Sequence, residues 1–191
     1  MGMHMESWPQ RHRITVQDYH RMAEVGLLAP DARVELIEGE IIDMAPIGHD
    51  HQSILDQLNR VLVMAVGDSA IVRTQGSIRL SQWSEPEPDV VLLKPRADFY
   101  RGEFALGTDA LLVIEVSDTT LRYDRDRKVP LYAHHGVPEA WVVDVNGNVL
   151  LVYRDLRDGK YERHVVLERP AAVPVTHLPG ITLDVRALFT P

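Results

Sequence analysis

Three short apolar runs constrain the fold of this chain more than any other feature. They cover residues 89–94, 110–116 and 140–143 and consist mainly of Val, Leu and Ile. Apolar runs of this length, without alternating polar residues, are typical of strands that are buried on both faces of a sheet. We therefore expect these three segments to form the centre of the sheet in a mixed α/β domain.

Capping signals and helical spacing predict three helices around these strands. Thr15 is a suitable N-cap for a short helix ending near residues 29–30. Apolar residues recur at helical spacing over roughly 50–66, and Gly67 then ends the pattern. A third helix is expected over 124–135.

The remaining extended segments are bounded by turn residues. Residues 34–44 predict a strand or a hairpin bent at Gly39, and a further strand is expected near 70–80. Asn146-Gly147 and Asp158-Gly159 are typical of tight turns between antiparallel strands. We therefore expect a C-terminal antiparallel meander after the third central strand.

Composition limits the classes of protein to consider. The 191 residues suffice for one domain, and we expect a flexible lead over 1–13 followed by a domain over 14–191. The chain contains no cysteine, which excludes disulfides, thiolate metal sites and cysteine nucleophiles. No apolar run resembles a signal peptide or a membrane span, so we expect a cytoplasmic protein that does not bind membranes.

The net charge of −8 bears on possible partners. A protein that binds nucleic acid mainly by neutralising phosphates is usually basic, so the charge argues against tight, sequence-independent binding to a duplex. Carboxylates that bind a metal ion add to the same negative balance, so a metal-dependent enzyme remains compatible with it.

Two acids and one lysine are the candidates for chemistry. Asp89 opens one apolar run and Glu115 interrupts another, while Lys128 lies in the helix predicted next. Carboxylates at neighbouring strand ends can hold a hard cation that activates water. The alternatives are an acidic loop at Asp89, a salt bridge at Glu115, and a surface pair between Asp124 and Lys128 four residues apart.

Other polar residues near these candidates are less informative. His49 and His51 have a spacing that could bind a transition metal, but without a third ligand a role at a helix N-terminus is the better interpretation. If Lys128 points inward, Arg122, Arg125 and Arg127 would supply positive charge around the site.

The ordered motifs resemble those of a known family. Pro88-Asp89, followed by an acid on the next core strand, resembles the PD-(D/E)XK nuclease superfamily, and the whole chain over roughly 14–190 looks like the Uma-two family of restriction-endonuclease-like proteins. The matching segments are 35–40, His51, 87–89, 113–117, 123–132, 136–144 and 178–183.

The resemblance implies a single-domain restriction-endonuclease-like fold, with a mixed central sheet flanked by helices and an added C-terminal meander. It implies a metal site made by Asp89, Glu115 and the Val116 carbonyl, with Glu35 as a further acid. The lysine that the superfamily carries two residues after the second acid is replaced by Ser117 here. In this family that role passes to the following helix, where Lys128 stands.

The expected function is therefore a Mg²⁺-dependent endonuclease acting on DNA, with Mn²⁺ as a possible substitute, because all the proposed ligands are oxygens. The alternatives are an inactive nuclease-fold module for binding or assembly, and a phosphodiesterase acting on another substrate. A homodimer is also expected, because Val149, Leu151, Tyr153 and Val165 could form an apolar sheet edge for a partner.

Overall fold

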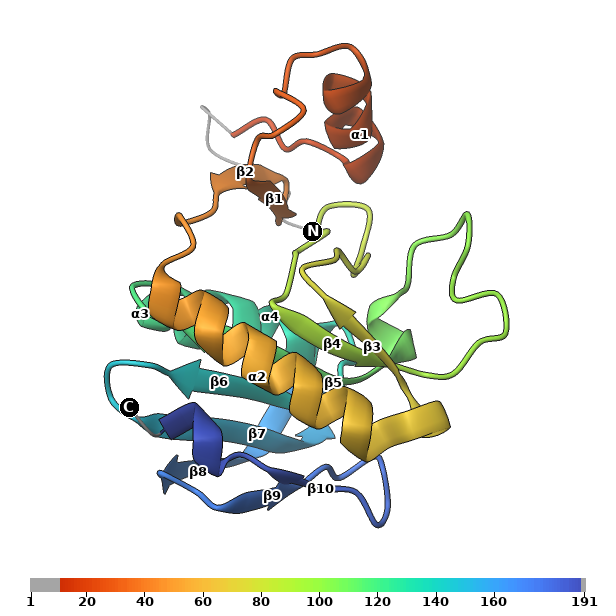
Figure 1. The fold of residues 1–191 in the computed structure, drawn as a ribbon. Coiled ribbons are helices and arrows are strands. Elements are labelled where there is room, and N and C mark those ends of the chain that lie inside the picture. The colour runs from red at the N-terminus through yellow and green to blue at the C-terminus, as the bar shows by residue number, and fades with distance from the viewer. Residues whose placement is uncertain (1–10, 190–191) are drawn as a thin grey trace, which may run out of the picture.

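A six-stranded mixed sheet forms the centre of the protein (Figure 1). The structure is a computed structural model that describes residues 11–189. The strand order is β3-β4-β5-β6-β7-β8, and only β5 and β6 run parallel to each other. The three predicted central runs become the adjacent strands β4, β5 and β6. The strands are β3 (Ile71–Thr74), β4 (Val90–Leu93), β5 (Ala110–Ser117), β6 (Ala140–Asp144), β7 (Val149–Arg157) and β8 (Lys160–Glu168).

The crossover between β5 and β6 is helical, as a parallel pair requires. It consists of α3 (Leu121–Tyr123), a π-helical turn (Asp124–Lys128, hereafter the π turn) and α4 (Val129–His134). The Val129 N–H donates to the Asp124 carbonyl five residues earlier. Pro130, which has no N–H to donate, follows directly in the first turn of α4. The helix predicted over 124–135 is therefore present, but it contains one wide turn.

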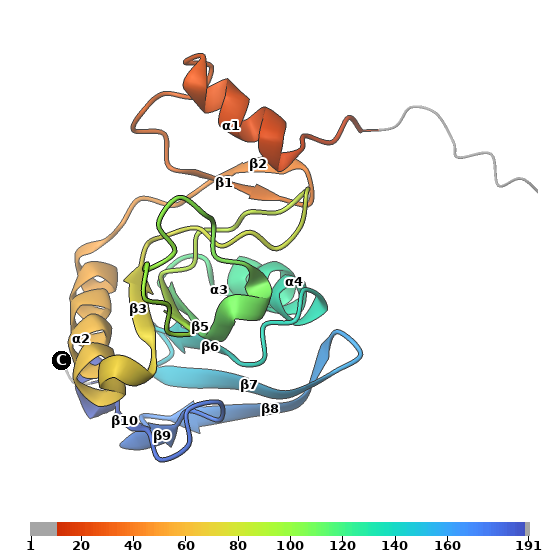
Figure 2. The ribbon, with the colours of Figure 1, turned by 90° about the vertical axis from the view of Figure 1, so that its right-hand side faces the viewer.

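The two faces of the sheet are covered by different helices (Figure 2). The helix α2 (His49–Val66) packs on one face together with the C-terminal pair β9 (Ala172–Pro174) and β10 (Thr182–Asp184), whereas α4 packs on the other. Along β5, alternate residues Leu112, Ile114 and Val116 belong to the core beneath α2. Because side chains alternate along a strand, the intervening residues, including Glu115, face the crossover helix.

An N-terminal unit stands above one end of the sheet (Figures 1 and 2). It contains α1 (Val16–Glu24) and the antiparallel pair β1 (Val34–Ile37) and β2 (Glu40–Asp43). The bend predicted at Gly39 is confirmed: Glu38 and Gly39 have φ of 52° and 85°, which a two-residue hairpin turn of the primed type needs. Strand β1 attaches to the body by a bridge between Leu36 and Glu85.

The end of α1 differs from the prediction. Thr15 caps the helix and accepts a hydrogen bond from the Asp18 N–H, as expected. The helix stops at Glu24, however, because Gly26 adopts a φ of 75° that turns the chain away. Leu27 consequently lies outside the helix and is 72% exposed.

The apolar edge predicted for a partner is formed only in part, because Val165 lies on the edge strand β8 whereas the other three predicted residues lie on β7. Strand β7 lies between β6 and β8, and Leu151 and Tyr153 are buried in the core beneath α4. The homodimer therefore stays a prediction that this edge does not support.

Of the predicted flexible lead over 1–13, residues 1–10 lie outside the described residues. Arg13 is held in place, because its Nε donates to the Glu38 carbonyl at 2.8 Å. In the described part of the chain, no helix is long and apolar enough to cross a membrane.

Candidate active site

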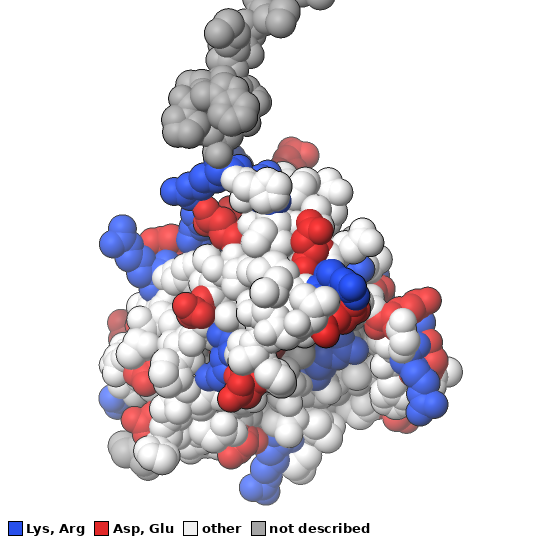
Figure 3. All heavy atoms as spheres, turned by 90° about the horizontal axis from the view of Figure 1, so that it is seen from above, with Lys and Arg blue, Asp and Glu red and all other residues white. Residues whose placement is uncertain are grey.

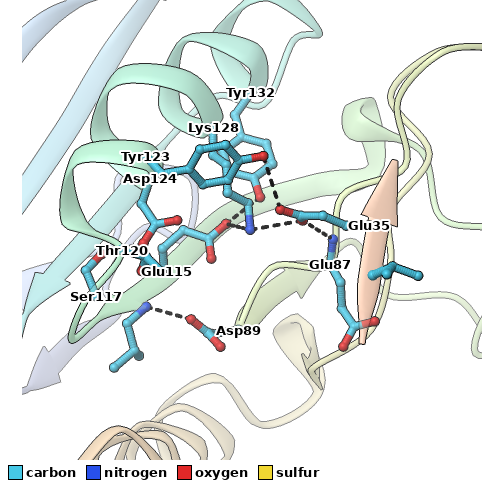
Figure 4. A network of polar contacts seen from close by, with 12 residues as sticks. Glu35, Glu87, Asp89, Glu115, Ser117, Thr120, Tyr123, Asp124, Lys128 and Tyr132 are labelled. Atoms are coloured by element: carbon cyan, nitrogen blue, oxygen red, sulfur yellow. Dashed lines mark hydrogen bonds and ion pairs between the residues drawn. The ribbon is translucent and has the colours of Figure 1, made fainter. Parts of the chain in front are cut away.

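Asp89 and Glu115 come together because β4 and β5 are antiparallel. The start of β4 lies beside the end of β5, with Val90 opposite Ile114. Asp89 precedes β4, and its Oδ2 accepts a hydrogen bond from the Val116 N–H at 2.8 Å (Figure 4). The N–H and C=O of one strand residue point to the same side of the strand. The Val116 carbonyl therefore faces the side on which Asp89 lies.

Lys128 points inward to Glu115, as the resemblance implied. The distance from Lys128 Nζ to Glu115 Oε1 is 2.9 Å, and both residues are only 3% exposed. The Tyr132 hydroxyl, one turn further along the helix, donates to the same Glu115 oxygen at 2.5 Å. The alternative of a surface pair with Asp124 is wrong, because Lys128 is buried and its ionic partners are Glu115 and Glu35.

Glu35 reaches the same point from the N-terminal unit. Its Oε2 lies 3.2 Å from Lys128 Nζ and accepts the Glu87 N–H at 3.1 Å. The Tyr123 hydroxyl donates to the other Glu35 oxygen at 3.5 Å. The structure thus brings together the four predicted side chains, Glu35, Asp89, Glu115 and Lys128, from four separate segments (Figure 4).

These side chains line a cavity of about 460 Å³ between α2, the β1–β2 hairpin and the crossover helix. Its walls are strongly acidic. The basic residues among them are Arg33 and Lys128, and the acidic ones are Glu35, Asp43, Glu87, Asp89, Glu115, Asp118 and Asp124. An acidic cavity beside one buried ammonium group is suited to a small cation and unsuited to an anion alone.

Burial determines the charge states at the centre. It raises the pKa of the Glu115 carboxyl well above its usual range; Lys128 opposes this shift, while Asp124, Asp89 and Glu35 add to it. Burial alone would lower the pKa of Lys128, but Glu115, Glu35 and Asp124 outweigh it and raise that pKa. The charged, ammonium form of Lys128 is therefore favoured in this cluster of carboxyl groups.

His51 also belongs to this cavity. It lies in the first turn of α2, and its Nε2 is 3.1 Å from Asp89 Oδ1. This hydrogen bond raises the pKa of His51, while burial opposes the rise. His51 therefore lies beside the acids of the cavity, as its match to the family allowed, and does more than occupy the N-terminus of a helix.

Within residues 11–189, no group of three or more His, Cys, Asp or Glu side chains is arranged to hold a metal ion.

Three residues of the network were not predicted as site residues. Asp124 is buried, and Tyr123 and Tyr132 donate to Glu35 and Glu115. The spacing of Asp124, Lys128 and Tyr132 by four residues places them on one helix face, which is the signal that could have revealed them. The charged residues between them made the same helix resemble a solvated surface.

The three arginines predicted to enrich the site do not line the cavity. Arg125 pairs with Asp126 at 2.7 Å and Arg127 with Glu38 at 3.1 Å, so acidic surface residues compensate both charges. Arg122 is 93% exposed in its side chain. The positive charge predicted from these three arginines is therefore absent from the cavity wall. The arginine that lines the cavity is Arg33.

Comparisons with known proteins agree with this architecture. A crystal structure of a "putative nuclease belonging to DUF820" from Anabaena variabilis ATCC 29413 superposes with a TM-score of 0.70 at 20% sequence identity, covering 92% of this chain and 97% of that one. At this identity the likeness defines the fold, which is of the restriction-endonuclease-like α/β class. A family model described as "Uma2: Putative restriction endonuclease" matches residues 16–186. The chain belongs to this family. No curated protein matches it.

Proposed function

We propose that this protein is a Mg²⁺-dependent endonuclease that hydrolyses phosphodiester bonds in DNA, with a site of the PD-(D/E)XK type. The observation that carries the proposal is the convergence of Asp89, Glu115, Lys128 and Glu35 in one acidic cavity. Family membership and the likeness to a nuclease-named structure support the reaction class.

The residues present fit a hard divalent cation. Asp89, Glu115 and the Val116 carbonyl offer oxygen atoms at adjoining strand ends, and the cavity has an excess of carboxyl groups. Magnesium binds through one or two protein carboxylates and completes its shell with water and substrate phosphate oxygens. A site with only two carboxylates is consistent with this habit. When bound, the ion would lower the pKa of a water molecule and neutralise charge on the phosphate.

Lys128 acts as a charge stabiliser in this proposal. Its ammonium group forms ion pairs with Glu115 and Glu35 and offers a positive charge to a scissile phosphate. The raised pKa favours this role over that of a base that deprotonates water. Glu35 holds the ammonium group from the opposite side to Glu115 and lies on the hairpin that closes the cavity.

Binding of the substrate depends on the site more than on a basic surface. On the face shown in Figure 3, basic and acidic side chains are interspersed and form no continuous basic area. With a net charge of −8, long-range attraction to a polyanion is weak. We therefore expect weak binding of DNA without metal, and binding that increases when the cation neutralises the carboxylates.

Cleavage of plasmid and single-stranded DNA with Mg²⁺ or Mn²⁺ tests the proposal. The unaltered protein should cut in either metal and not in a chelator, and Asp89→Ala should be inactive while remaining folded. Asp126→Asn, an exposed acid of the π turn, is the matched control and should cut normally. Equal DNA degradation by the unaltered protein and Asp89→Ala would show that the cleavage comes from a contaminant and would overturn the proposal.

An inactive nuclease-fold binding or assembly module is the second candidate. Two observations favour it: the acidic charge of the chain, and the absence of a ready three-ligand cluster in the described residues. It predicts that Mg²⁺ leaves the melting temperature unchanged, whereas a true site is stabilised by the ion it binds. Hydrolysis of a phosphodiester other than DNA is tested by adding small aryl phosphodiesters to the same assay.

A further inference from the structure

Asp124 connects three consecutive pieces of the chain beside the site. It opens the π turn, one turn before Lys128, and its side chain points back to the end of β5 (Figure 4). Its Oδ2 accepts hydrogen bonds from Ser117 Oγ at 2.7 Å and from Thr120 Oγ1 at 2.5 Å. Ser117 ends the strand and Thr120 precedes α3. One carboxylate therefore attaches the crossover helix to the strand that carries Glu115.

The place of Ser117 gives this attachment its importance. Side chains alternate along a strand, so Ser117 lies on the same face of β5 as Glu115, and it is fully buried. A lysine at Ser117 would stand directly beside Glu115. In this chain the hydroxyl at that place instead binds the residue one turn before Lys128. Ser117 is thus linked through the Asp124 side chain to the π turn that carries Lys128.

Attaching the crossover helix to β5 through the Ser117 and Thr120 hydroxyls does not by itself require a charged side chain at position 124. Asp124 is 5% exposed, and within the described residues it forms no ion pair, because the ionic partners of Lys128 are Glu35 and Glu115. A buried carboxylate that makes no direct ion pair is costly, and the longer-range attraction of Lys128 and the two hydroxyl hydrogen bonds offset only part of that cost. A neutral side chain could hold one of the two hydroxyls at a lower cost. A carboxylate at position 124 is explained if its negative charge helps to hold the Lys128 ammonium group in place.

The π turn gives the geometry for such an effect. Its wide hydrogen bond from the Val129 N–H to the Asp124 carbonyl spans the segment that carries both Asp124 and Lys128. Both side chains are buried, whereas Asp126 between them is 46% exposed in its side chain. Fixing Asp124 at the start of this turn fixes the direction in which Lys128 leaves it.

We propose that Asp124, held by the hydroxyls of Ser117 and Thr120, is a positioning residue that sets the Lys128 ammonium group against Glu115 and Glu35. Its importance for turnover rests on the nuclease function proposed above. Two other roles are possible for a buried acid at this place: a further ligand for the metal ion, or a purely structural cap. Each gives a different result in the tests below.

The position of Lys128 can be observed directly, without activity. The chain contains three lysines, Lys94, Lys128 and Lys160, so labelling lysine with ¹³C at Cε gives three sets of NMR signals. Loss of one set in Lys128→Met assigns it. We expect Asp124→Asn, Ser117→Ala and Thr120→Val to shift the Lys128 signal, and Asp126→Asn to leave it in place. An unshifted Lys128 signal in folded Asp124→Asn would overturn the proposal.

A double-mutant cycle tests the consequence for cleavage. Asp124→Asn should lower kcat by about 100-fold, as misplacing a catalytic group does. In a Lys128→Met background it should cause no further loss, because both changes remove the same interaction. Mg²⁺ affinity measured by calorimetry should stay the same. Additive losses would indicate a structural cap, and a weakened Mg²⁺ affinity would indicate a ligand; either would overturn the proposal. If the unaltered protein cuts no DNA while the lysine signal shifts as expected, the nuclease function fails and the positioning of Lys128 stands.

Discussion

Lys128 Nζ lies 2.9 Å from Glu115 Oε1, and this contact joins the crossover helix to the strand that precedes it. Both groups are buried, and each charge is tolerated because the other is present. The same ammonium group reaches Glu35 on the N-terminal hairpin at 3.2 Å. Tertiary contacts therefore assemble the site around the Lys128 ammonium group. Removing this group should affect both the stability of the protein and its chemistry.

Replacing Lys128 with Met should be costly for stability. It leaves Glu115 and Glu35 buried without their shared cation, a change that typically costs about 3–5 kcal/mol. Urea unfolding at neutral pH measures the difference. Adding Mg²⁺ should restore part of the lost stability, because a divalent cation can replace the missing positive charge. A loss below about 1 kcal/mol, the range of exposed pairs, would contradict the buried pairing.

Replacing Tyr132 with Phe should destabilise the protein by about 1.5–3 kcal/mol, since its hydroxyl donates to the buried Glu115 carboxyl. Tyr161→Phe is the matched control, because that hydroxyl donates to the Val137 carbonyl at 2.9 Å, away from the cavity. We expect only Tyr132→Phe to alter Mg²⁺ affinity in calorimetry. Equal Mg²⁺ affinities for the two variants would show that the Tyr132 hydroxyl does not influence the site.

Glu35 and Glu115 should differ in their effect on metal binding, although both contact Lys128. Glu115→Gln removes a proposed ligand and should abolish the rise in melting temperature with Mg²⁺. Glu35→Gln removes a partner of the ammonium group, and should lower the cleavage rate while leaving that rise in place. Thermal melting over a Mg²⁺ titration compares them. Loss of the Mg²⁺ effect in Glu35→Gln would make Glu35 a ligand.

Glu139 offers a prediction about stability alone. It is fully buried and accepts hydrogen bonds from Arg154 Nε at 2.6 Å, Trp141 Nε1 at 2.7 Å and the Thr176 N–H at 2.8 Å. Glu139→Ala leaves the Arg154 guanidinium group without its ion-pair partner and should cost about 3–5 kcal/mol in denaturant unfolding. It lies outside the cavity, so the folded fraction should cleave DNA at the normal rate. A folded but inactive variant would place Glu139 in the site.

The sequence predicts the sheet well because each central strand is a continuous apolar run. The ends of β4, β5 and β6 agree with the predicted segments to within a residue or two. Asp89 and Glu115 were identifiable for the same reason, since an acid next to such a run stands out. The inward direction of Lys128 came from the family resemblance, because the residues alone also allowed a surface pair with Asp124.

Other parts of the site depend on contacts that sequence spacing does not determine. Glu35 reaches Lys128 only because the hairpin docks through Leu36 on Glu85, a pairing between distant segments. The π turn comes directly before the first turn of α4, which contains Pro130, and periodicity does not reveal it. The predicted partner edge was wrong for Leu151 and Tyr153 for a similar reason: β8 pairs with β7, and both residues lie in the core cluster that includes residues of α4.

The central claim is that Asp89, Glu115 and the Val116 carbonyl form one metal site, and that the Lys128 ammonium group lies beside it in contact with Glu115. A crystal structure with Mn²⁺, located by its anomalous scattering, tests it most directly. The account predicts an anomalous peak about 2.0–2.3 Å from oxygens of both carboxylates, with Lys128 Nζ next to Glu115. A peak bound elsewhere, or none at Mn²⁺ concentrations that support cleavage, would contradict it.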